Sequence, residues 1–185
     1  FKFYSILPAM LASSFIITGI VINQSFIIES KEWDKFAIAK SFMIYSLLTV
    51  GTLFFSGFLV DKFTSRKLIP IVNIPLLMSM LTLYFINHEI SAFIFLGLIG
   101  ASNGLANVLG TSTWAEIYGV NYIGSIKALT TALMVFSTAF GTALFGILID
   151  NGFSVEKIAF ISGTYIVVSL FLLLLFRKKI EPINL

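Results

Sequence analysis

The spacing of the charged residues is the feature that most constrains this chain. Six long stretches carry no Asp, Glu, Lys or Arg, and each exceeds the roughly 18 apolar residues that a helix needs to cross a bilayer. None of them alternates as a membrane β-strand would, and backbone amides in lipid must pair within their own segment. The sequence therefore predicts an all-α membrane protein with six transmembrane helices. The uncharged stretches are residues 3–28, 41–60, 68–87, 90–115, 128–149 and 158–176. The spans predicted around them are residues 4–28, 38–60, 68–87, 91–113, 125–149 and 158–176.

The composition excludes a soluble fold. The chain is 58% hydrophobic and 11% charged, against about 45–50% and 25% in soluble domains. A soluble domain of this size cannot bury so much apolar surface. The chain has no Cys, so disulfide and thiolate chemistry are excluded, and no metal site or cofactor is expected. It begins at Phe1 rather than Met, and we expect it to be part of a longer protein.

The basic residues are divided unequally between the two sides of the membrane. An even number of spans places both termini on one side, which carries eight Lys and Arg against four on the other. Because cytoplasmic loops hold the excess of basic residues, both termini are expected in the cytoplasm, with the segment in the plasma (inner) membrane. This asymmetry explains the pI of about 9.2 without nucleic-acid binding. The eight residues are Lys2, Lys62, Arg66, Lys67, Lys127, Arg177, Lys178 and Lys179.

Small and polar residues are concentrated in the first and fourth spans. In the fourth, Gly100 and Gly104 form a small-xxx-small pair that permits close helix contact. Asn103 and Asn107 lie four residues apart on one helical face, which must meet protein or water rather than lipid. The third and sixth spans are more apolar, so the pattern repeats after three spans. This rhythm favours two inverted three-helix repeats, the plan of many secondary transporters.

A charged motif, GFLVDKFTSRK, occupies residues 57–67 at the end of the second span. Gly57 allows a neighbouring helix to approach, and Asp61 is placed to accept from the N-terminal amides of an adjacent helix. Arg66 and Lys67 can pair with a carboxylate or a lipid phosphate. The motif resembles the loop G-x3-D-[RK]-x-G-[RK]-[RK] of the major facilitator superfamily, with a Thr-Ser pair in place of the glycine and one extra residue.

Two further stretches extend the resemblance. The sequences WAEIYG at 114–119 and GSIK at 124–127 look like the loop between helices ten and eleven of that superfamily. The sequence GTALFGILIDNG at 141–152 looks like the end of helix eleven. All six spans then match helices seven to twelve in order. The chain therefore resembles the C-terminal six-helix half of a twelve-helix transporter.

The resemblance implies a secondary active transporter that works by alternating access. An N-terminal six-helix half would be the partner within the bilayer, and the substrate would be a small solute, with or without a coupling ion. A gate of charges at the cytoplasmic face would bias the conformational equilibrium, although solvated helix-end charges are the alternative. The implied gating residues are Gly57, Asp61, Arg66, Lys67, Glu116 and Lys127.

The resemblance also implies which residues meet the substrate. In this superfamily the first and fourth helices of each half line a central cavity, although the same side chains could instead form interhelical hydrogen bonds. None of the six uncharged stretches holds an ionisable group, so either the charged determinants lie in the other half or the substrate is neutral. The candidate cavity residues are Asn103, Asn107, Asn23 and Gln24, with Thr18 and Tyr45 behind them.

Two other interpretations of the six predicted spans are possible besides half of a transporter. One is a six-span membrane subunit or an intramembrane enzyme, which would need a Ser–His pair, paired aspartates or a metal cluster at membrane depth. The single histidine, His88, lies in a predicted turn and no Asp stands at mid-span, so we expect no enzymatic activity. The other is a homodimer of six-helix chains.

Overall fold

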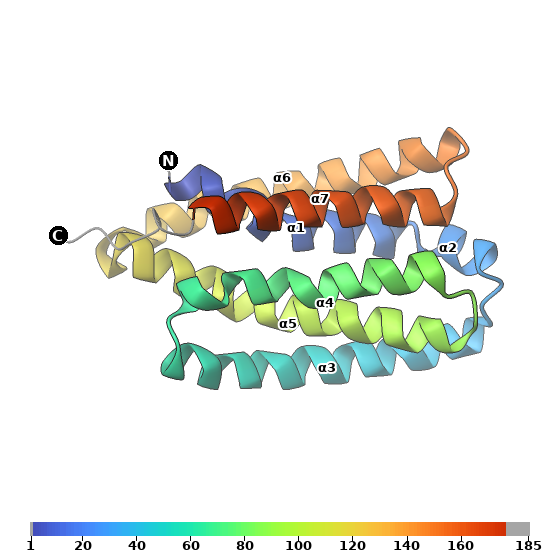
Figure 1. Cartoon of the computed structure of the whole chain (residues 1–185), viewed down its shortest axis with the longest axis horizontal. Helices are drawn as coiled ribbons and strands as arrows, with labels where there is room; N and C mark the ends of the chain where they lie inside the picture. Colours follow the sequence, from blue (N-terminus) through green and yellow to red (C-terminus); the bar gives the residue numbers. More distant parts are fainter. Residues whose placement is uncertain (1, 177–185) are drawn as a thin grey trace.

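The protein is built from helices. The computed structural model describes residues 2–176, and every regular element in that range is helical (Figure 1), which confirms the all-α prediction. Arg177, Lys178 and Lys179, counted above among the basic residues, lie outside the described residues, as does the side chain of Lys2. The elements are α1 (Lys2–Ile22), α2 (Gln24–Ser30), α3 (Lys35–Lys62), α4 (Ser65–Phe85), α5 (Ile90–Tyr118), η1 (Val120–Tyr122), α6 (Ile123–Asp150) and α7 (Val155–Phe176).

Six of these helices, α1 and α3 to α7, are long and apolar enough to cross a membrane. Several extend beyond the predicted spans, and α5 runs to Tyr118 instead of ending near residue 113. The predicted spans were drawn where the residues are apolar. A helix continues outside the hydrocarbon until the backbone N–H and C=O groups at its ends find other hydrogen-bond partners. Asp34 begins α3 by accepting a hydrogen bond from the Ala37 amide at 3.2 Å. Gly119, with φ of 78°, ends α5.

The first predicted span, residues 4–28, is interrupted in the structure. It is divided at Asn23 into α1 and the short α2. Asn23 has φ of −97° and ψ of 22°, and its Nδ2 donates to the Gly19 carbonyl at 2.8 Å. Asparagine side chains compete with the backbone for such hydrogen bonds, which explains why α1 ends at this position.

The helices form two three-helix units of opposite direction. The first unit is α1, α3 and α4, and the second is α5, α6 and α7. α3 packs on α5 as α6 packs on α1, and α4 packs on α5 as α7 packs on α1. If α1, α3 and α4 are exchanged with α5, α6 and α7, each of these four contacts is therefore converted into another of the four. α1 begins at the end of the bundle that holds the N-terminus and α5 begins at the opposite end (Figure 1), in agreement with the inverted repeats that the sequence predicted.

Glycine allows α3 and α5 to pack in close contact. A Cβ atom at Gly100 would collide with the Tyr45 carbonyl oxygen, and one at Gly104 would collide with the Thr49 carbonyl oxygen. Thr52 Oγ1 lies 2.7 Å from the Leu48 carbonyl oxygen of its own helix and 3.2 Å from the Ala101 carbonyl oxygen across the same contact, so its one hydrogen is shared between them. The predicted small-xxx-small pair thus faces α3, and a side chain at either glycine would push the helices apart.

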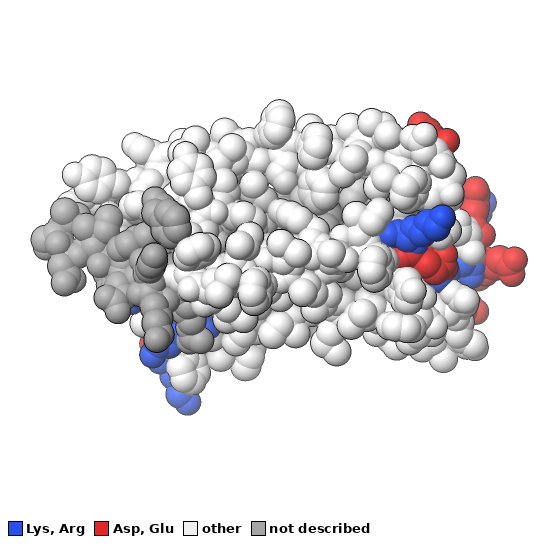
Figure 2. All heavy atoms as spheres, turned by 45° about the horizontal axis from the view of Figure 1, so that its top comes forward, with Lys and Arg blue, Asp and Glu red and all other residues white. Residues whose placement is uncertain are grey.

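The charged side chains lie at the two ends of the bundle, and the face seen in Figure 2 is uncharged between them. Large apolar side chains such as Phe54, Phe58, Phe136 and Phe140 are exposed on α3 and α6. We call the end with the α3–α4 turn and the α5–α6 connection the basic end, and the other the acidic end. In the described residues the basic end carries Asp61, Lys62, Arg66, Lys67, Glu116 and Lys127. The acidic end carries Glu29, Lys31, Glu32, Asp34, Lys35, Lys40, Glu89, Asp150, Glu156 and Lys157.

A buried lysine ties three segments together at the acidic end. Lys31 Nζ donates to Asn87 Oδ1 at 2.5 Å and pairs with Glu156 Oε1 at 2.7 Å, and its side chain is 1% exposed. These residues belong to the α2–α3 loop, the α4–α5 turn and the first turn of α7. The pair therefore joins both three-helix units away from the termini, a contact that the sequence alone did not reveal.

Candidate functional site

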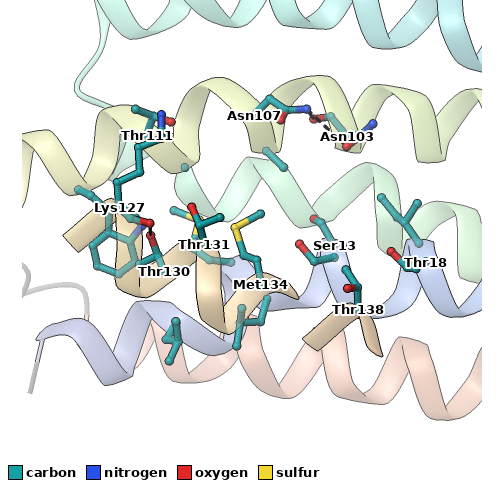
Figure 3. Close-up of a pocket in the computed structure, with 18 of the residues that line it drawn as sticks. Ser13, Thr18, Asn103, Asn107, Thr111, Lys127, Thr130, Thr131, Met134 and Thr138 are labelled. Carbon is teal, nitrogen blue, oxygen red and sulfur yellow. Dashed lines mark hydrogen bonds between the residues drawn. The ribbon is translucent and has the colours of Figure 1, made fainter. Parts of the chain in front are cut away.

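A cavity lined by both polar and apolar side chains lies between α1, α5 and α6 (Figure 3). Its volume is ≈ 460 Å³, and it extends along α1 from Leu7 to Thr18 and along α5 from Asn103 to Trp114. At the rise of an α-helix this corresponds to about 17 Å, roughly half the thickness of the hydrocarbon core. Its polar lining consists of Ser13, Ser14, Thr18, Asn103, Asn107, Thr111, Lys127, Thr130, Thr131 and Thr138.

The two asparagines of α5 both line this cavity. Asn103 Nδ2 donates to the Tyr45 hydroxyl at 2.8 Å. Asn107 Nδ2 donates to the Asn103 carbonyl at 2.9 Å and contacts Asn103 Oδ1 at 3.5 Å. Tyr45 does not line the cavity itself but contacts Asn103 from α3, and its role towards a substrate stays a prediction. Thr18 lies in the lining.

The hydroxyl groups of the lining differ in how they are used. Thr130 donates to the Ile126 carbonyl at 2.9 Å and Thr138 to the Val135 carbonyl at 2.7 Å, the usual arrangement for a hydroxyl within a helix. Four others make no hydrogen bond to any part of residues 2–176, and each can donate to and accept from a molecule in the cavity. These are Ser14, Thr18, Thr111 and Thr131.

Lys127 extends from the fifth residue of α6 into the end of the cavity nearest the basic end. Figure 3 shows its side chain crossing from α6 towards Thr111 on α5. Within the described part of the chain it is the one charged side chain that lines the cavity, and it makes no hydrogen bond or ion pair there. We expected Lys127 in a gate with Asp61, Arg66 and Glu116; the structure places it on the cavity, apart from the Glu116–Arg66 pair, and its gating role stays a prediction.

The Glu116 carboxylate caps the N-terminus of α4. Its Oε1 accepts from the Ser65 amide at 2.7 Å, and its Oε2 accepts from the Arg66 amide and from Arg66 Nε, each at 3.3 Å. A carboxylate at a helix N-terminus satisfies free amides and complements the helix dipole. Thr64, which precedes the helix, makes no capping hydrogen bond of its own. Glu116 therefore joins the end of α5 to the α3–α4 turn.

The other predicted gating residues do not join this pair. Asp61 was expected to accept from the amides of an adjacent helix, but in residues 2–176 it is exposed without a hydrogen bond or ion pair. Glu116 fills the corresponding role at α4, because the end of α5 lies beside the start of that helix. Lys67 is exposed. A Cβ atom on Gly57 would have no neighbour within 4 Å, so its expected close helix contact is not made here.

Asn23 and Gln24 lie away from the cavity. They follow the break that ends α1, towards the acidic end, whereas the cavity extends towards the basic end. Asn23 bonds to its own helix, and Gln24 borders a separate hollow of ≈ 20 Å³ beside Trp33 and Phe95. The helix break turns these two side chains away from the cavity that Thr18 reaches.

Sequence reasoning missed several polar residues. Ser14, Thr111 and Thr131 line the cavity, and a sequence signal existed for one of them, because Thr111 continues the four-residue spacing of Asn103 and Asn107. Asn73 is buried in α4, and its Nδ2 donates to the Ala9 carbonyl at 2.8 Å. An amide inside an apolar span is itself a signal of a protein-facing position.

A catalytic or metal centre is not apparent in the described residues. No group of three or more His, Cys, Asp or Glu that could hold a metal ion occurs between residues 2 and 176. His88 is exposed, and its Nδ1 accepts from the Ile90 amide at 3.2 Å. The arrangement at the cavity offers hydrogen-bond donors, acceptors and one positive charge, which is the chemistry of a binding site.

These features define a class of polytopic membrane protein with a polar cavity inside an inverted-repeat bundle. The family model described as Major Facilitator Superfamily matches residues 5–184. The chain belongs to the major facilitator superfamily, a superfamily of membrane transporters. No curated protein and no solved structure matched the chain.

Proposed function

We propose that this chain forms one half of a secondary active transporter that moves a small solute across the membrane. The observation that carries the proposal is the ≈ 460 Å³ cavity lined by polar groups from three membrane-length helices. Hydroxyl and amide groups at membrane depth are costly toward lipid, so water or a polar solute is their natural partner. A cavity of this volume falls within the range of small-molecule sites, about 300–1,000 Å³.

The proposed mechanism is alternating access. A second six-helix half would cover the cavity, and the exposed apolar faces of α3 and α6 would meet it. Rocking of the two halves would then open the shared cavity to one side of the membrane at a time. With the excess of basic residues in the cytoplasm, the basic end of the bundle and the mouth near Lys127 would face the cell interior.

The proposed gate is formed at the basic end. The Glu116–Arg66 pair links α5 to the α3–α4 turn, so this end of the half would move as one body. Asp61 is exposed, which leaves its carboxylate available to a group on the second half. A contact that forms in only one conformation shifts the equilibrium between conformations by its own free energy.

Uptake by the full-length protein in proteoliposomes tests the transport function. A panel of labelled solutes should be screened with and without a proton gradient, and Asn103→Ala and Asn107→Ala should then change KM for the transported solute. Asn151→Ala is the matched control, because Asn151 is exposed outside the cavity and bonds only to the Ile147 carbonyl of its own helix. Failure of the protein to transport any solute would contradict the proposal.

A second comparison tests the gate. Asp61→Asn should lower kcat for uptake while membrane insertion and melting temperature stay unchanged, because only an interaction with the second half is removed. Asp150→Asn, which neutralises an exposed acid at the acidic end, is the control. Normal uptake by a well-expressed Asp61→Asn variant would show that Asp61 does not take part in the gate.

A further inference from the structure

The positive charge of Lys127 makes no hydrogen bond, ion pair or ring contact with residues 2–176. Lys62 lies over the Phe63 ring at 5.7 Å and Lys157 over the Phe153 ring at 5.8 Å, whereas Lys127 has no comparable contact with the described residues. It also stands near the N-terminus of α6, the positive end of the helix dipole, where a cation is not stabilised. Its side chain is exposed and adds to the basic excess at this end of the bundle, and its place on the cavity also allows it to bind a solute.

The described lining of the cavity holds no counter-charge for Lys127. No Asp or Glu is among the lining residues in the described part of the chain. Glu116, on the neighbouring end of α5, is already bound to Arg66 and to the first amides of α4. Both the ammonium group and the nearby start of α6 would accordingly favour an anion in this part of the cavity.

Two hydroxyl groups that make no hydrogen bond within residues 2–176 lie near Lys127 in the cavity. Thr131 lies one turn from Lys127 on the same face of α6, and Thr111 faces the lysine from α5 (Figure 3). Neither hydroxyl has a partner in residues 2–176, so each can donate to an anionic oxygen. Asn107, one turn further along α5, continues the polar lining towards Asn103.

We propose that Lys127 binds the carboxylate of the substrate, and that the substrates are small hydroxylated monocarboxylates. The carboxylate would pair with the ammonium group and Thr111 and Thr131 at the basic end. The hydroxyl groups of the substrate would reach Asn107, Asn103 and Thr18 deeper in the cavity. A single lysine without a second cation in the described lining suits one negative charge better than a phosphate dianion.

This inference rests on the proposed transport function. It assigns a negative charge to the substrate, whereas the uncharged stretches alone had also allowed a neutral one. Lys127 directly precedes the uncharged stretch of residues 128–149, so a search for charges within that stretch did not include it. The packing of α6 on α1 brings the lysine to the cavity, which α5 lines from the other side.

The test compares matched solutes that differ only in the anionic group. Uptake and competition are measured in proteoliposomes of the full-length protein with gluconate against sorbitol, and with erythronate against erythritol. The acids should be taken up in preference to the alcohols. Lys127→Gln should raise KM for gluconate about tenfold or more, because a hydrogen bond to a charged group is lost. Lys127→Arg should retain most of the uptake, and Lys157→Gln should match the wild type.

Two further measurements separate binding from gating and from folding. Gluconate should raise the melting temperature of the wild type and not that of Lys127→Gln, which should elute as the same monodisperse species. Thr131→Val leaves the charge intact and should raise KM for gluconate by a smaller factor.

Each other outcome overturns the inference in a distinguishable way. Uptake of sorbitol or erythritol that is insensitive to Lys127→Gln would overturn the anionic class while leaving the transport function in place. Competition by inorganic phosphate and not by gluconate would overturn the carboxylate. If Lys127→Gln lost the uptake of neutral and anionic solutes alike, Lys127 would act in gating and not in binding the carboxylate. Absence of any uptake by the wild type would overturn the transport function itself.

Discussion

Replacing Gly104 with alanine tests the close packing of α3 on α5. The new Cβ would collide with the Thr52 hydroxyl and the Thr49 carbonyl oxygen, and would lie 3.0 Å from the Leu53 nitrogen. Two of these three atoms belong to the backbone and cannot rotate away, so the helices must separate. Overpacking of this kind costs about 1–3 kcal/mol. Separation would also lengthen the 3.2 Å contact from Thr52 Oγ1 to the Ala101 carbonyl oxygen, which shares the hydroxyl hydrogen with the Leu48 carbonyl and adds at most about 0.6 kcal/mol.

The combined loss is expected to be about 2–3 kcal/mol. Thermal unfolding of the purified protein in mild detergent measures it. Gly51→Ala is the matched control on α3, because a Cβ there has nothing within 4 Å. A domain of this size loses about 2–4 °C of melting temperature per kcal/mol, so Gly104→Ala should melt roughly 4–12 °C below Gly51→Ala. Equal melting temperatures for the two variants would refute the reasoning.

Three further substitutions test the polar contacts. Glu116→Ala removes the acceptor of the α4 amides and the partner of Arg66 and should cost about 1–2 kcal/mol. Glu116→Gln keeps an acceptor and should melt between that variant and the wild type, an order that thermal unfolding checks. A double-mutant cycle of Lys31→Met and Glu156→Gln should give a coupling of about 1 kcal/mol, since the Lys31 side chain is 1% exposed; additive losses would show that the pair contributes nothing. Asn73→Val breaks a fully buried hydrogen bond to a carbonyl of α1 and should lower stability by about 1–3 kcal/mol, whereas an unchanged unfolding curve would contradict this.

The membrane spans could be predicted from the sequence because their cause is local. A stretch without charges partitions into hydrocarbon whatever the rest of the chain does, and its backbone must then be helical. The boundaries were less predictable, since capping decides them: Asn23 bonds to Gly19 and interrupts the first span, while α5 continues to Gly119.

Part of the candidate site could also be predicted from residue type. Asn103 and Asn107 were expected to avoid lipid, and both line the cavity with Thr18. The same reasoning placed Asn23 and Gln24 with them, because residue type does not reveal that the helix breaks between Thr18 and Gln24. Their functional roles stay predictions until uptake is measured.

The sequence by itself determined the number and the order of the membrane helices, because each helix follows from the composition of one segment; the rhythm of small and polar residues favoured the inverted repeat, which the packing of the helices then showed. Only the tertiary structure decided which distant side chains meet. It assigned the start of α4 to Glu116 rather than to Asp61 and brought Lys127 to the cavity. It also paired Lys31 with Glu156 across 125 residues of chain. The physical reason is that hydrophobicity acts on each segment separately, whereas hydrogen bonds and ion pairs form only after packing fixes which segments are neighbours.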